Sequence, residues 1–273
     1  MRSTRSLFKI FANGCRIAIF VIGLALAYAP MAHAGGVVSI CDGTPAAEAN
    51  LRTALAGGGK VTFTCSGTII LSSTVTISSP NETTIDGTGQ NVTISGGNAL
   101  TVFFVPTGVK LNLNKPTIAN GSADSGGGIY NEGMLTVTNS TLSSNSAQND
   151  GGGIENDYGT LTVRNCKFTS NTGAYGGGIE NLNGTANVSN TMFSGNSAQN
   201  DGGGIENDGG TLEVDDDTFS DNIGSEAGGI ENDGGTLTVT NSTFSGNKGV
   251  DSGGGIENYF GTLTVINSTI SRQ

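Results

Sequence analysis

The sequence contains a single histidine, His33, and only 12 basic residues against 23 acidic ones. All of the acidic residues follow residue 34, whereas four of the basic ones precede it. The part beyond residue 34 therefore keeps eight basic and 23 acidic residues, a net charge of −15, and no histidine. Nucleic acids and anionic membranes are bound through Lys and Arg, so this balance argues against both as partners. No apolar run after residue 34 is long enough to span a membrane.

The first 34 residues have the pattern of a secretory signal peptide. An apolar run covers 17–29, a small-x-small site ends at Ala34, and four basic residues come before the run: Arg2, Arg5, Lys9 and Arg16. Thirteen helical residues span only about 20 Å, less than a hydrocarbon core of ~30 Å, so a retained membrane anchor fits less well. We predict cleavage after Ala34, export from the cell, and a single domain over 35–273.

Three cysteines remain after that segment. Export leads to an oxidising compartment, where cysteines pair. Cys41 and Cys65 flank one N-terminal unit, so we predict a disulfide between them. Cys166 stands where sister repeats carry a serine (Ser140, Ser242 and Ser268), which favours a small buried side chain over a reactive thiol.

Glycine is abundant, unlike histidine, cysteine and the basic residues, and much of it lies in a recurring phrase, Gly-Gly-Gly-Ile-x-Asn. The isoleucines of this phrase are 25 or 26 residues apart: Ile129, Ile154, Ile179, Ile205, Ile230 and Ile256. A second phrase, Leu-Thr-Val or a variant of it, keeps the same period, with its valines at Val137, Val163, Val188, Val214, Val239 and Val265. A third, Phe-x-x-Asn, begins at Phe168, Phe193, Phe219 and Phe244. So short and regular a period predicts a solenoid, in which each repeat buries its apolar face on its neighbours.

Each repeat reads as three short strands, because β-branched and apolar residues alternate with polar ones between Gly and Asn turns. The fold class expected is therefore all-β: a right-handed, three-faced parallel β-helix with coils of about 25 residues and a short N-terminal capping helix. We predict the regular coils over 126–273 and looser coils over 61–125. The positions of Leu142, Ile118 and Ile94, 24 residues apart, set the register of the looser coils.

The one helix is expected over 44–59, within an N-terminal cap of 35–60. Thr44 can cap it, Pro45 suits the first helical position, and the glycines at 57–59 end it. Its apolar residues Ala47, Leu51 and Leu55 fall on one face. Such a cap covers the exposed end of a solenoid, where unpaired amides would otherwise bind other chains.

Asparagines line up in three columns when the coils are stacked. The first is Asn131, Asn156, Asn181, Asn207, Asn232 and Asn258; the second is Asn139, Asn165, Asn190, Asp216, Asn241 and Asn267. The third holds the asparagines of Phe-x-x-Asn, preceded by Asn145. Stacked amides can hydrogen-bond from coil to coil, so we expect these columns to be structural.

These repeats carry a family resemblance. Gly126-Gly127-Gly128-Ile129 with Leu142-x-x-Asn145, and Gly202-Gly203-Gly204-Ile205 with Phe219-x-x-Asn222, resemble the repeat signature of the polymorphic outer membrane proteins and related bacterial secreted β-helix proteins. The resemblance implies a secreted protein, or one on the bacterial cell surface or outer membrane, that adheres to or shields against other surfaces. Those outer membrane proteins end in a translocating β-barrel, which this sequence lacks. A C-terminal anchor domain in a longer protein is therefore left open, as is the identity of a glycan or protein ligand.

Carboxylates form the best candidate site. We expect Glu155, Glu180, Glu206, Glu231 and Glu257 to point outward one coil apart, with Asp157, Asp208 and Asp233 on the same face. Like charges ~4.8 Å apart repel by about 0.9 kcal/mol in bulk water. Calcium bridging the coils would offset this repulsion, and the alternative is a solvated, salt-screened acidic face. No other cofactor and no catalytic residue is predicted.

The alternative function is a carbohydrate-active β-helix, similar to pectate lyases or polysaccharide-binding proteins. Its candidate acids would be Asp215, Asp216, Asp217 and Asp221, with Arg164 as the one basic group nearby. The Gly-His-Gly and Arg-x-Lys patterns typical of polygalacturonases do not occur beyond residue 34. A charge of −15 also disfavours a polyuronate substrate. We therefore expect a structural or adhesion protein without catalytic activity.

Overall fold

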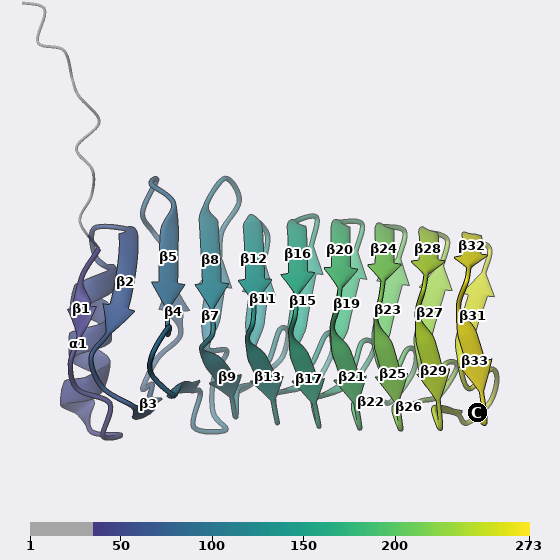
Figure 1. The fold of residues 1–273 in the computed structure, drawn as a ribbon, viewed down its shortest axis with the longest axis horizontal. Coiled ribbons are helices and arrows are strands. Elements are labelled where there is room, and N and C mark those ends of the chain that lie inside the picture. Colours follow the sequence, from purple (N-terminus) through teal and green to yellow (C-terminus); the bar gives the residue numbers. More distant parts are fainter. Residues whose placement is uncertain (1–34) are drawn as a thin grey trace, which may run out of the picture. The chain divides into compact units, whose positions relative to one another are not determined.

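The computed structural model describes residues 35–273, in which strand after strand stacks in parallel from one coil to the next (Figure 1). The predicted all-β parallel solenoid with one short helix is confirmed. The proposed signal peptide lies outside the described residues. Among the residues described, no helix is long and apolar enough to cross a membrane.

Each regular coil before the last contributes a strand to four sheets in turn, which we name by their residues, and the last contributes to three of them. The Leu-Thr-Val sheet contains β1 (Val37–Val38), β2 (Gly59–Phe63), β5 (Thr83–Asp86), β8 (Lys110–Asn114), β12 (Met134–Thr138), β16 (Thr160–Arg164), β20 (Thr185–Ser189), β24 (Thr211–Asp215), β28 (Thr236–Thr240) and β32 (Thr262–Ile266). The Phe sheet contains β3 (Gly67–Ile70), β6 (Val92–Ser95), β9 (Thr117–Ala119), β13 (Thr141–Ser143), β17 (Lys167–Thr169), β21 (Met192–Ser194), β25 (Thr218–Ser220), β29 (Thr243–Ser245) and β33 (Thr269–Ser271).

The other two sheets complete the coil. The Glu sheet contains β4 (Val75–Thr76), β7 (Phe103–Val105), β11 (Ile129–Asn131), β15 (Ile154–Asp157), β19 (Ile179–Leu182), β23 (Ile205–Asp208), β27 (Ile230–Asp233) and β31 (Ile256–Tyr259). The two-residue sheet contains β10 (Ser122–Ala123), β14 (Ser146–Ala147), β18 (Thr172–Gly173), β22 (Ser197–Ala198), β26 (Ile223–Gly224) and β30 (Lys248–Gly249). This two-residue strand adds a fourth side to the three that the sequence predicts.

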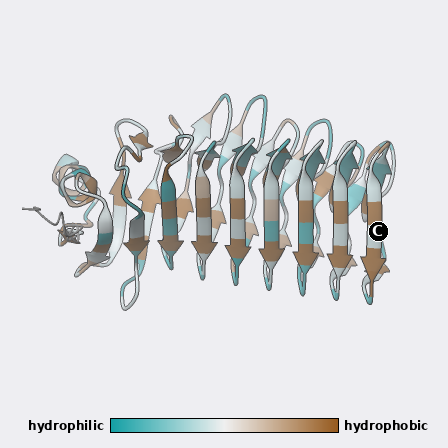
Figure 2. Cartoon of the chain, turned by 90° about the horizontal axis from the view of Figure 1, so that it is seen from above, coloured by the Kyte–Doolittle hydropathy of each residue, from teal (hydrophilic) through white to brown (hydrophobic). Residues whose placement is uncertain are grey.

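The core is built from repeated apolar columns, visible as aligned brown bands in Figure 2. In-register pairing places Ile154 on Ile179 and Val163 on Val188, as the period predicts. The rings of Phe168, Phe193, Phe219 and Phe244 are fully buried and stack at centroid distances of 4.8, 4.7 and 4.6 Å. The spacing of stacked rings thus matches the strand spacing of a β-sheet.

Two of the three predicted asparagine columns form amide ladders. In the first, each side-chain Nδ2 donates to the Oδ1 of the next coil at 2.6–2.7 Å, from Asn131 to Asn258. The third column does the same from Asn145 to Asn247 at 2.9–3.0 Å, and the Oε1 of Gln273 accepts from Asn247. Buried amides are satisfied on both sides in this way.

The second column is structural, as predicted, but it does not form the expected amide ladder. Its residues, such as Asn165 and Asn190, are exposed and adopt the left-handed conformation, with φ between 50° and 58°. Asn and Asp tolerate this conformation better than other residues with a side chain. Their role is therefore to turn the backbone between the Leu-Thr-Val and Phe sheets.

The N-terminal cap consists of α1 (Pro45–Leu55), which packs against β1, β2 and β3. The helix is shorter than predicted, since Gly58 and Gly59 have positive φ and Gly59 already begins β2. Its buried face includes Ala47 and Leu51, and the predicted Cys41–Cys65 disulfide ties the start of the cap to the end of β2. In the looser coils, the predicted register of Ile94, Ile118 and Leu142 is confirmed.

Candidate functional site: a covered carboxylate column

The five predicted glutamates do stack in one column on the Glu sheet, on the side away from the isoleucines. Their burial, however, contradicts the prediction of an open face. The exposed fractions of Glu155, Glu180, Glu206 and Glu231 are only 1%, 4%, 2% and 6%. Glu257, in the last coil, is partly buried. A solvated, salt-screened acidic face is therefore not what this column forms.

The glutamates are covered by the loop that precedes each Glu-sheet strand. This loop folds back against the strand that follows it. The approach is so close that a Cβ placed on Gly176 or Gly202 would overlap the carbonyl oxygen of Ile179 or Ile205. Only glycine allows so close a backbone approach. In one coil the loop also binds the column directly, since the backbone N–H of Gly151 donates to Oε2 of Glu155 at 3.0 Å.

Loop and column together enclose an acidic cavity of about 310 Å³. Of the described residues that line it, six are acidic and none is basic: Asp150, Glu180, Asp201, Glu206, Asp208 and Asp233. Tyr175 and Leu182 complete the lining. The cavity thus concentrates acidic side chains beside the buried glutamates of the column.

The pKa values of the glutamates rise in this setting. Burial raises the pKa of Glu206 well above its usual value, and repulsion from Glu231 and Asp201 adds to the effect. Burial, followed by the charge of Asp201, raises the pKa of Glu231 to about 8. Burial and the charge of Glu226 raise the pKa of Asp201 to about 6. For Glu155 and Glu180, burial is again the main cause of a raised pKa.

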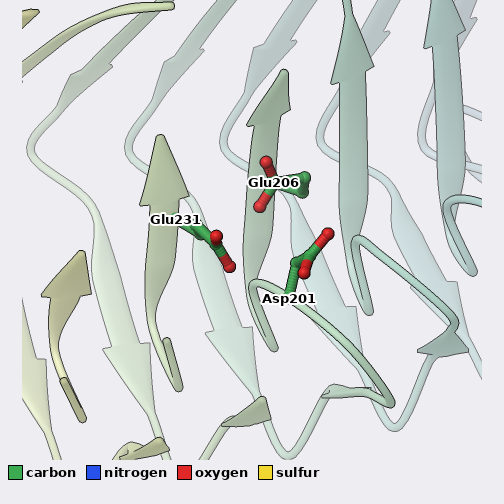
Figure 3. Close-up of side chains that lie close together, drawn as sticks. All are labelled: Asp201, Glu206 and Glu231. Carbon is green, nitrogen blue, oxygen red and sulfur yellow. The ribbon is translucent and has the colours of Figure 1, made fainter. Parts of the chain in front are cut away.

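One group of carboxylates comes close enough to share a ligand. Oxygens of Asp201, Glu206 and Glu231 lie within 4.8 Å of one another. Glu206 and Glu231 come from β23 and β27, and Asp201 comes from the covering loop (Figure 3). Sequence reasoning found the two glutamates and missed Asp201. The glycine triplet directly after Asp201 is the signal that could have revealed a loop folded back over the column.

The predicted aspartates take different positions. Asp208 and Asp233 line the cavity, and Asp208 is exposed. Asp157 lies toward the N-terminal end of the column, where its Oδ2 accepts a hydrogen bond of 2.8 Å from the Tyr130 hydroxyl. Tyr130 occupies the glutamate position one coil earlier and stacks on Phe104. The acidic column therefore begins where an aromatic pair ends.

The acidic cluster proposed for the enzymatic alternative is not brought together. Asp215 is exposed on the outer face of the Leu-Thr-Val sheet, where it borders a shallow depression with Arg164. Asp216 makes the left-handed turn, and Asp217 is buried, with its Oδ1 accepting from the Thr191 backbone N–H at 2.6 Å. Because Asp217 is buried and hydrogen-bonded while Asp215 and Asp216 are exposed at the end of the strand and at the turn, the three carboxylates do not line a common cleft.

Cys166 shares its column with Asp217, Ser140 and Thr191. It is a buried free thiol whose Sγ lies 3.1 Å from the Arg164 carbonyl oxygen. Burial raises the pKa of this thiol to about 11. Thiolate chemistry at neutral pH is thus disfavoured, in agreement with the packing role that the sequence indicates.

Comparison with known proteins adds little. No protein-family model and no curated protein matches the sequence. Among solved structures, the chain is similar to an alginate lyase from Paenibacillus sp. strain FPU-7, with 12% identity and a TM-score of 0.38, over 86% of this chain and 99% of that one. A likeness of this size carries no argument about activity.

Proposed function

We propose that this chain is a non-catalytic β-helix that acts as a rigid structural or adhesion module on the outside of a bacterial cell. The observation that carries the proposal is the unbroken register from β11 to β33, in which every regular coil adds a strand to the Glu, Leu-Thr-Val and Phe sheets. Two buried amide ladders and a stacked phenylalanine column hold the coils in that register. A stack of this kind repeats its outer side chains at fixed intervals, which suits many weak contacts with another surface.

Two further features support an extracellular setting. The Cys41–Cys65 disulfide suits a protein that matures in an oxidising compartment. The resemblance of the Gly-Gly-x-Ile and Phe-x-x-Asn repeats to the polymorphic outer membrane proteins favours a cell-surface role. The ligand in this proposal is a glycan or protein of another surface.

The test is localisation combined with adhesion. Expressed from the full chain in a bacterial host, the protein should be cleaved after Ala34 and recovered outside the cytoplasm. Cys41 and Cys65 should react with an alkylating reagent only after reduction of their disulfide. Beads coated with it should adhere to cells or glycan arrays above the level of beads coated with the heat-unfolded chain. Cytoplasmic protein with reactive Cys41 and Cys65 would contradict the proposal. So would release of unsaturated or reducing sugar from pectate, which would favour the carbohydrate-active alternative.

A further inference from the structure

The covered carboxylate column holds more negative charge than its surroundings compensate. Carboxylates one coil apart, at ~4.8 Å, would repel by about 3.5 kcal/mol at an effective dielectric of ~20. Glu206 faces such a neighbour in Glu231, and the loop adds Asp201 to the pair instead of a lysine or arginine. Three carboxylates gathered under a loop are stabilised either by protonation, as their raised pKa values show, or by a positive partner that keeps them ionised.

An independent observation shows that the carboxylates lack partners. The Oε2 atoms of Glu206 and Glu231 are shielded from solvent and accept no hydrogen bond. Both side chains are more than nine-tenths buried, with exposed fractions of 2% and 6%. Buried acceptors of native proteins are normally satisfied, and an orphaned pair beside a cavity marks a missing donor or ion. The two oxygens are therefore available as ligands.

The geometry fits a calcium ion. Calcium binds six to eight oxygens at about 2.3–2.6 Å, so oxygens on opposite sides of the ion lie roughly 4.6–5.2 Å apart. The three carboxylates lie within 4.8 Å of one another, inside that span. The adjoining cavity of about 310 Å³ leaves room for water ligands, since one water takes up roughly 30 Å³. Magnesium, at about 2.0–2.1 Å, requires a tighter octahedral shell.

We propose that Asp201, Glu206 and Glu231 form a calcium-binding site that joins the covering loop to two consecutive coils of the Glu sheet. The ion takes one carboxylate from the loop, one from β23 and one from β27 (Figure 3). Binding offsets the repulsion within the column and fixes the loop over it. This site goes beyond the proposed surface function and does not depend on it.

Tyr175 provides a way to detect the ion, because its side chain borders the same cavity. Terbium(III) binds at calcium sites, and a nearby tyrosine sensitises its emission. The purified chain should show tyrosine-sensitised terbium emission that calcium displaces at lower concentrations than magnesium does. Tyr175→Phe should lose most of this emission. Emission that persists in Tyr175→Phe would overturn the assigned position, and equal displacement by magnesium would overturn the choice of calcium.

Binding and stability are then measured by calorimetry and thermal melts. Millimolar calcium should raise the melting temperature, and Glu206→Gln should weaken calcium binding at least tenfold. Asp201→Asn changes only the loop and should weaken binding similarly, which guards against a folding defect in the column. The matched control is Glu213→Gln, an exposed glutamate on β24, which should leave the affinity within twofold. An unchanged melt in calcium, or Glu206→Gln and Asp201→Asn variants that bind calcium as tightly as the unsubstituted chain, would overturn the proposal.

Discussion

Two columns on the same strands behave in opposite ways. On β23, Glu206 belongs to the carboxylate column and its neighbour Asn207 to an amide ladder, and both side chains are buried. Asn207 donates to Asn232 and accepts from Asn181, both at 2.6 Å. Glu206 has an oxygen without any partner. In-register stacking places each side chain on a copy of itself. This arrangement stabilises an amide, which both donates and accepts hydrogen bonds, and destabilises an ionised carboxylate, which only accepts them.

The largest effect is expected when one amide of the ladder is converted into a carboxylate. Asn207→Asp removes the donor to Asn232 Oδ1 and to the Gly210 carbonyl oxygen, and leaves acceptors facing acceptors. We expect the free energy of unfolding to fall by about 3–5 kcal/mol, as for an uncompensated buried charge. Urea unfolding at neutral pH measures the change, and a loss below about 1 kcal/mol would show that the ladder contributes little.

The second expected effect is a dependence of stability on pH without divalent cations. The folded-state pKa values of Glu206 and Glu231 are raised above the unfolded value of about 4.3, so their contribution to stability is full below that value and is lost as the pH rises. For Glu231 the loss extends to about pH 8. The charged groups that act on this pair are all carboxylates, and each of them raises its pKa values: Asp201, Asp208, Asp233, Glu226 and Glu257.

Thermal melts in a chelator should therefore show a melting temperature that falls between pH 5 and pH 8. Several carboxyl groups titrate together, so the change should exceed that of a single substitution in the column. Excess calcium should flatten the dependence if the proposed site is occupied. A melting temperature that rises over this range would contradict both the buried column and its raised pKa values.

The third prediction concerns the reverse change, in which a carboxylate of the column becomes an amide. Glu206→Gln supplies the missing donor and removes a repelling charge, so we expect a gain of about 1–2 kcal/mol at pH 8 without calcium. At pH 5 the gain should shrink, because the native carboxyl is then protonated. Glu213→Gln, exposed on the Leu-Thr-Val sheet, should change stability by less than about 0.5 kcal/mol at either pH. If both substitutions changed the free energy of unfolding equally, the buried carboxylate column would not differ from an exposed glutamate.

The smallest effect is expected in the second asparagine column. Asn190→Asp places a carboxylate at an exposed left-handed turn, where Asp216 already stands one coil later. Stability should change by less than about 0.5 kcal/mol, whereas Asn190→Ala should lose about 1 kcal/mol because alanine disfavours this conformation. Denaturant melts of the two variants separate backbone conformation from side-chain charge. A large loss in Asn190→Asp would show that this column, too, contributes through stacking.

The sequence predicted the stack because periodicity reports which residues repeat and at what spacing. The isoleucine and phenylalanine columns and the two amide ladders follow from that information, whereas the Cys41–Cys65 pair was predicted from export and from its position around one N-terminal unit. The looser coils were predicted less completely, since β5 and β8 belong to the Leu-Thr-Val sheet but do not carry its phrase. Similar asparagines also proved to have different roles, because repetition alone does not distinguish a ladder from a left-handed turn.

The candidate site was predicted only in part for a related reason. Alternation along a strand shows that Glu206 points away from Ile205, but it does not show what lies on that side. The covering loop varies from coil to coil: Ser-Ala-Gln-Asn-Asp occurs at 146–150 and again at 197–201, but in the coil between them a tyrosine, Tyr175, stands in place of the aspartate. The burial of the column depends on the path that the backbone of the glycine triplet takes over the next strand. That path is a feature of the three-dimensional structure and cannot be seen in the repeat pattern.

The in-register stack also has a mechanical consequence. Each regular coil pairs only with the coils before and after it, so tension applied through residues 35 and 273 detaches coils one at a time from a free edge. Ile179 and Ile205 mark one such coil of 26 residues, whose release lengthens the chain by about 85–95 Å at ~3.3–3.6 Å per residue. Pulling experiments on single molecules would thus record a series of nearly equal extensions, and the protein would yield to load gradually and absorb work at each step.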